Sequence, residues 1–77
     1  MATHPRITRN PRILKGKPVI EGTRISVAFI LELLAANWTE AEIAENYPGV
    51  TPDDIRACLS YARDVVGEMS VVPSAAE

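Results

Sequence analysis

The stretch from residue 15 to residue 25, Lys-Gly-Lys-Pro-Val-Ile-Glu-Gly-Thr-Arg-Ile, most constrains how this chain folds. Gly16 and Gly22 permit backbone angles that other residues avoid, and Pro18 fixes φ at about −65°, so the stretch cannot be helical throughout. A short basic arm precedes it, and three segments with helical periodicity follow it. The sequence therefore predicts a mainly α fold with a hinge in front of the helices.

The length of 77 residues predicts one domain with one small core, which a partner chain can complete. A single cysteine excludes an intrachain disulfide and a cysteine-based zinc site, which favours a reducing compartment. No apolar run approaches the ~18 residues of a membrane span, and the first residues lack the apolar segment of a secretory signal. We therefore expect a cytoplasmic protein without membrane contact.

The net charge of −2 conceals an asymmetry along the chain. Residues 1–25 carry six cations against Glu21 alone, a net charge of +5, and residues 26–77 carry two cations against nine acids, a net charge of −7. This division indicates either two partner surfaces or like molecules that pack head to tail. The alternative is a basic tail without a partner.

The basic arm alternates polar and apolar residues over 6–9, which predicts a short strand. Short extended pieces at 19–20 and 24–25 are expected to pair with it or with another chain. Residues 1–5 are expected to be frayed.

The segment 27–36 predicts a first helix, with Ser26 as its N-cap and Asn37 in the left-handed conformation after its end. It carries one charge and is apolar nearly all round, so we expect it to lie centrally in the core or under a neighbouring chain.

The Thr-Glu-Ala-Glu sequence at 39–42 fits a capping box and predicts a second helix that ends near Tyr47. The Thr-Pro-Asp-Asp sequence at 51–54 predicts the start of a third helix that fades over 67–69, with both acids at its exposed positive end. The predicted domain spans 6–69, and 70–77 is expected to be a flexible tail in which Val71 and Val72 can order only on a partner.

A short helix, a turn with Gly and a longer helix have the spacing of a helix-turn-helix, which three-helix bundles without DNA binding share. The first turn of a recognition helix approaches phosphates, and here Asp53 and Asp54 would repel them. The basic arm is therefore the better candidate to contact DNA. The predicted nucleic-acid-binding residues are Arg6, Arg9, Arg12, Lys15, Lys17, Arg24, Arg56 and Arg63. For Arg24, an intramolecular pair with Glu21 or with a helix acid is the equal alternative.

Other candidate sites have simpler interpretations. Gly16-Lys17 is not a phosphate loop, because Pro11 and Pro18 occupy positions that the motif assigns to Gly and to Ser or Thr. His4 lies in the frayed end without a ligand set, and Cys58 is expected to be a buried hydrophobic residue. Trp38 and Tyr47 are expected to anchor the corner between the first two helices. We expect no catalytic residue, no cofactor and no metal site.

The sequences at 10–27, containing Gly-Lys-Pro-Val-Ile-Glu-Gly-Thr-Arg-Ile, and at 43–62 closely resemble a family of small prokaryotic proteins known as domain of unknown function DUF433. The resemblance covers about residues 7–66. This chain departs from the family pattern at Lys15 and Asn37, where the family usually has Gly.

The resemblance implies a homeodomain-like helix-turn-helix fold behind a short β element. It also implies an antitoxin of a toxin–antitoxin pair, often encoded beside a PIN-like ribonuclease toxin. We therefore expect a non-enzymatic, homodimeric, antitoxin-like regulator whose first helix and hinge form the subunit contact. Its basic arm would bind operator DNA, and its acidic helices or tail would bind the toxin. The alternative is a protein-interaction module of the same fold that binds no DNA.

Overall fold

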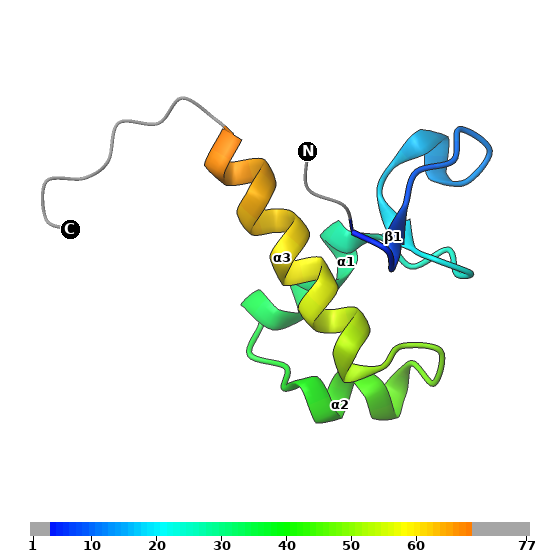
Figure 1. Cartoon of the computed structure of the whole chain (residues 1–77). Helices are drawn as coiled ribbons and strands as arrows, with labels where there is room; N and C mark the ends of the chain where they lie inside the picture. The colour runs from blue at the N-terminus through cyan, green and yellow to red at the C-terminus, as the bar shows by residue number, and fades with distance from the viewer. Residues whose placement is uncertain (1–3, 69–77) are drawn as a thin grey trace, which may run out of the picture.

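The computed structural model describes residues 4–68 and confirms three helices behind a two-stranded antiparallel element (Figure 1). The elements in chain order are β1 (Ile7–Thr8), the single turn η1 (Leu14–Gly16), β2 (Val19–Ile20), α1 (Val27–Ala35), α2 (Glu40–Asn46) and α3 (Pro52–Glu68). The predicted tail at 70–77 lies outside the described residues. Of the helices within residues 4–68, none combines the length and the apolar character that crossing a membrane requires.

The hinge stretch pairs with the arm of its own chain. Ile7 lies opposite Ile20 in the antiparallel ladder, and the Glu21 amide donates a hydrogen bond of 2.8 Å to the Arg6 carbonyl. The Ile20 amide donates to the Ile25 carbonyl at 2.9 Å, and the Val27 amide donates to the Pro18 carbonyl at 3.0 Å. Residues 17–27 thus join the arm directly to the start of α1, and both strands lie beside the helices (Figure 1).

Left-handed backbone occurs at both positions where this chain departs from the family pattern. Lys15 has φ of 58° and Asn37 has φ of 75°, and Leu14 and Gly16 on either side of Lys15 also have positive φ. Glycine adopts this conformation freely, whereas other residues do so at a cost of about 1–2 kcal/mol. The expected left-handed geometry of Asn37 is therefore confirmed, and Lys15 has a backbone conformation that glycine would adopt without this cost.

The helix starts follow the predicted capping pattern. The Ser26 hydroxyl accepts a hydrogen bond of 3.0 Å from the Phe29 amide. Thr39 and Glu42 form the complete capping box, with hydrogen bonds of 2.8 and 3.1 Å. These bonds satisfy amides that the first helical turn leaves without partners.

The core lies where the three helices meet the second strand. It consists of the buried side chains of Ile20, Val27, Ile30, Ile43, Val50, Ile55 and Cys58. At the corner between α1 and α2, the Tyr47 ring lies 5.4 Å from Phe29 and 6.3 Å from Trp38, centroid to centroid. The predicted anchoring role of Trp38 and Tyr47 is confirmed.

The expectation that His4 belongs to a frayed end is wrong. Its Nε2 lies 3.1 Å from an Asp64 carboxylate oxygen, and its ring meets Tyr61 edge-on at 5.2 Å. Both partners lie on α3, so the arm is fastened to this helix before the first strand begins. Sequence position alone suggested a loose terminus, because the contacts are about 60 residues away along the chain.

Replacing Gly22 by Ala is expected to lower the free energy of unfolding by about 1 kcal/mol, because Gly22 has φ of 81°. An added Cβ meets no atom within 4 Å there, so the loss reflects the backbone alone. Gly49→Ala is the matched control, since that site is equally open and its φ is not positive. Urea denaturation measures both variants, and equal losses would contradict the assignment.

Candidate nucleic-acid interface

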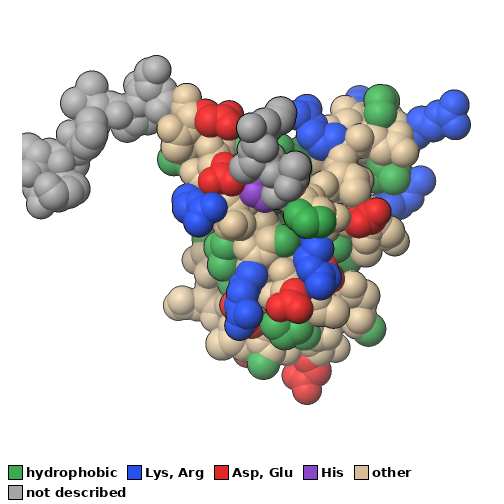
Figure 2. Space-filling view, viewed as in Figure 1, with side chains coloured by type: hydrophobic (Ala, Val, Ile, Leu, Met, Phe, Trp, Pro, Cys, Tyr) green, Lys and Arg blue, Asp and Glu red, His purple; other side chains and the backbone are tan. Residues whose placement is uncertain are grey.

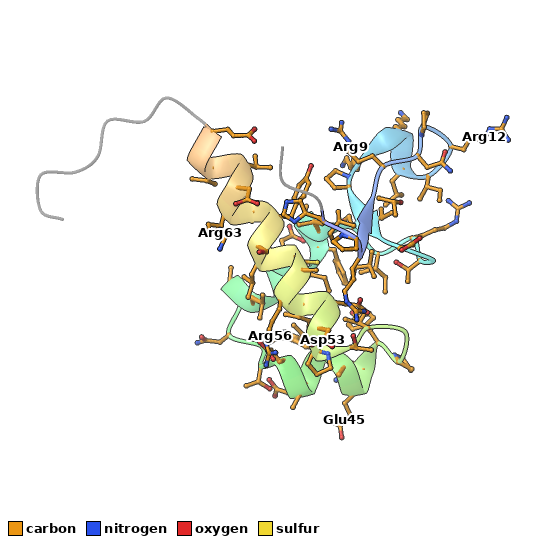
Figure 3. The ribbon with its side chains drawn as sticks, viewed as in Figure 1. Arg9, Arg12, Glu45, Asp53, Arg56 and Arg63 are labelled. Atoms are coloured by element: carbon orange, nitrogen blue, oxygen red, sulfur yellow. The ribbon has the colours of Figure 1, made fainter. Side chains whose placement is uncertain are left out.

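The structure divides the eight predicted nucleic-acid-binding residues into two groups. Four lie between β1 and β2 and one follows β2 near the end of the hinge, and we call this region the basic lobe: Arg9, Arg12, Lys15, Lys17 and Arg24. The other three, Arg6, Arg56 and Arg63, lie along α3. Arg9 and Arg12 project from the lobe and Arg56 and Arg63 from the helix, so the structure does not bring all eight together (Figure 3).

The cations of the basic lobe are exposed and are not held in ion pairs. All five side chains are exposed, and none forms an ion pair with another residue of the described range 4–68. The intramolecular pair considered for Arg24 is therefore not observed there. The Arg9 Nε donates a hydrogen bond of 3.1 Å to the Gly16 carbonyl, which braces the turn from inside the lobe. Lys and Arg side chains accordingly gather on this part of the surface (Figure 2).

Asp54 is buried, which corrects the expectation that both acids at the start of α3 are exposed. Its residue surface is only 7% accessible, and its Oδ1 accepts a hydrogen bond of 3.1 Å from Arg6 Nη1. Its Oδ2 accepts a bond of 3.0 Å from the Thr51 amide, while its own amide donates to the Thr51 hydroxyl at 3.1 Å. Asp54 thus completes a capping box and neutralises Arg6.

The cations along α3 all face acids. Asp53 lies between two guanidinium groups, 3.7 Å from Arg6 Nη2 and 3.8 Å from Arg56 Nη1. Arg63 Nη2 lies 3.1 Å from Asp64 Oδ1. Charges and countercharges alternate on this face, so its net field is weaker than that of the lobe (Figure 2).

A groove of about 390 Å³ separates the start of α1 from the second half of α3. Its walls are Lys17, Pro18, Ser26, Val27, Ala28, Leu31, Tyr61, Ala62, Val65 and Val66. Lys17 is the one charged side chain among them, and Val65 and Val66 are exposed. The apolar surface of α1 is therefore not fully used by the core of this chain.

Cys58 is fully buried, as predicted. Burial raises the pKa of its thiol to about 11, and the Asp54 carboxylate adds to this effect. The thiol therefore stays protonated at neutral pH and lacks the thiolate that a nucleophile or metal ligand needs. Among residues 4–68, no three His, Cys, Asp or Glu side chains are placed to hold a metal ion.

Sequence reasoning missed two features of this region. The Thr51-to-Asp54 spacing carried a signal, because it is a capping box with Asp in the place of Glu, and that arrangement turns the carboxylate inward. No signal in the sequence predicted the contacts that His4 and Arg6 make with α3, because these contacts depend on how the arm lies in three dimensions.

Comparison with known proteins places this arrangement in a family. A family model described as a protein of unknown function, DUF433, matches residues 7–62. The uncharacterized protein y4eO of Sinorhizobium fredii is 34% identical over 56 residues, which are 73% of this chain and 25% of that protein.

Two solved structures are similar in fold and sequence. A DUF433 member protein from Anabaena variabilis has a TM-score of 0.75 at 27% identity, over 82% of this chain and 62% of that one. Rv2018 from Mycobacterium tuberculosis has a TM-score of 0.61 at 40% identity, over 69% of this chain and 24% of that one. The chain thus spans about a quarter of y4eO and of Rv2018.

A double-mutant cycle of Arg6→Ala and Asp54→Ala is expected to give a coupling free energy of about 1–2 kcal/mol, because Asp54 is buried and Arg6 is half exposed. The cycle of Arg56→Ala and Asp53→Ala, an exposed pair, is the control and should stay below about 0.5 kcal/mol. Urea denaturation gives both values, and equally small couplings would show that the first pair does not stabilise the fold.

Proposed function

This chain belongs to the DUF433 family, whose function is unknown, and we propose that it is a cytoplasmic, non-enzymatic, antitoxin-like regulator that binds its own operator DNA. The observation that carries the proposal is the basic lobe, whose five exposed cations form no ion pair within the described range 4–68. Uncompensated Lys and Arg side chains gain affinity for DNA by releasing its counterions.

The lobe, and not the start of α3, supports the main DNA contact. It is built on a two-stranded element with a braced turn, and β-ribbons are one of the structures that bind DNA grooves. The first turn of α3 carries the exposed carboxylate of Asp53, which opposes the usual approach of a recognition helix to phosphate.

A second copy of the chain is the proposed occupant of the apolar groove. The groove combines the start of α1 with the hinge residues Lys17 and Pro18, which are the elements expected to form a homodimer contact. Its near absence of charge suits a permanent contact between subunits, since obligate interfaces are the more hydrophobic ones.

A PIN-like ribonuclease toxin is the proposed protein partner, as the resemblance to the family implies. The acidic side chains of α2 lie at the opposite end of the molecule from the lobe, as Glu45 and Arg12 show, so both partners could bind at once (Figure 3). The neighbouring reading frame tests this proposal: a PIN-like ribonuclease there that copurifies with this chain would support it, and an unrelated neighbour would weigh against it.

A protein-interaction module that binds no DNA is the second candidate. The paired charges along α3 favour it, because each arginine on this face already lies beside an acid.

Titrating the protein against its own promoter at several salt concentrations tests DNA binding. Replacing Arg12, Lys15 and Arg24 together by Ala should make the plot of log K against log salt concentration less steep. The magnitude of its slope should fall by about 2–3, because each lost phosphate contact reduces it by about 0.9. Arg63→Ala is the control, because this guanidinium is already paired with Asp64. No binding by the wild-type protein at low salt would contradict the regulator and favour the interaction module.

Val65→Asp is expected to shift a dimer of twice 8.4 kDa toward the monomer, because it places a carboxylate in the apolar groove. Leu59→Asp is the matched control: both side chains are 43% exposed on α3, and Leu59 does not line the groove. Sedimentation equilibrium at micromolar concentration measures the mass. A wild-type monomer, or equal effects of the two variants, would refute the contact.

A further inference from the structure

A second hollow, of about 340 Å³, lies where the arm crosses the first half of α3. His4, Arg6, Asp53, Arg56 and Ser60 contribute its polar groups. Two of these are guanidinium groups from segments about 50 residues apart in the sequence. The hollow is separate from the basic lobe, and none of the lobe residues lines it.

Arg6 is oriented before any ligand arrives. Its Nη1 is held at 3.1 Å by the buried carboxylate of Asp54, which fixes the plane of the guanidinium. The other terminal nitrogen, Nη2, is then directed toward Asp53. An arginine whose guanidinium group is already held in place loses less conformational entropy when it binds an anion.

Asp53 lies between the two arginines but is held loosely. Its two carboxylate oxygens lie 3.7 Å from Arg6 Nη2 and 3.8 Å from Arg56 Nη1, both beyond hydrogen-bonding distance. Its side chain is 64% exposed, so the pairs are screened by solvent and rotation away from them costs little. The carboxylate therefore lies between the two arginines without a hydrogen bond to either, and an anion can displace it when its side chain rotates away.

A third donor is available beside the arginines. The Ser60 hydroxyl oxygen accepts a hydrogen bond of 3.3 Å from Arg63 Nη2, which leaves its own O–H free to donate. Ser60 follows Arg56 by one helical turn, so both side chains lie on the same face of α3.

We propose that this hollow binds a phosphate group, with Arg6, Arg56 and Ser60 as donors, and that Asp53 weakens the binding by occupying the space between the arginines. The source of the phosphate is the nucleic-acid backbone, a step that rests on the proposed function. Arg6 and Arg9 flank β1 three residues apart, about 10 Å along an extended chain. The hollow and the lobe therefore lie at opposite ends of β1.

Inorganic phosphate tests the site independently of DNA. In ¹⁵N-labelled protein at constant ionic strength, with chloride as the reference anion, phosphate should shift the amide signals of Arg56 and Ser60 and follow a saturation curve. Asp53→Asn should strengthen this binding by about fivefold, because it removes one negative charge that repels the phosphate from about 4 Å away. Arg56→Gln should abolish the saturation.

Glu45→Gln is the matched control, since it changes the net charge equally and lies on α2, away from the hollow (Figure 3). Equal effects of Asp53→Asn and Glu45→Gln, or shifts that do not localise to the hollow, would overturn the proposal. Operator DNA then separates the two proposals. Phosphate binding without DNA binding would refute the regulator and the nucleic-acid source but not the anion site, whereas DNA binding unaffected by Asp53→Asn and without phosphate binding would refute only this site.

Discussion

The buried carboxylate of Asp54 is the contact on which the arrangement of this small domain depends. One of its oxygens accepts the Thr51 amide at the start of α3, and the other accepts the Arg6 guanidinium from the arm. A buried carboxylate is costly unless its oxygens have partners, so its burial requires both segments to be in place. Asp54 therefore couples the helix start, the arm and, through β1, the hinge.

This coupling also determines how charge is distributed. Arg6 is used to neutralise Asp54, and the remaining cations of α3 lie beside Asp53 and Asp64. The lobe cations form no ion pair within the described residues, and Glu21 is the one acid of the hinge beside them, so most of their positive field is not cancelled. The excess of positive charge before residue 26 thus becomes a localised surface, whereas Arg6 of the arm and Arg56 and Arg63 of α3 are largely balanced by neighbouring acids.

Local signals in the sequence predicted most of the fold. The capping residues Ser26 and Thr39, the left-handed Asn37 and the buried Cys58 depend on neighbours within a few positions or on helical periodicity, and all were predicted correctly. The division of the cations was only partly predictable in this way. Arg56 and Arg63 lie beside acids close to them in the sequence, but Arg6 pairs with Asp54, 48 residues away, and sequence spacing does not encode such a contact.

Lys17 connects the two surfaces that the proposed function uses. It belongs to the basic lobe and also lines the apolar groove, so a second copy bound in the groove would lie directly beside the lobe. Such a contact would fix the spacing between two lobes, and binding of the first lobe to DNA would then raise the effective concentration of the second. Within the described range 4–68, only five of the Lys and Arg side chains form no ion pair. Operator affinity would therefore depend on the apolar groove as strongly as on the charges themselves.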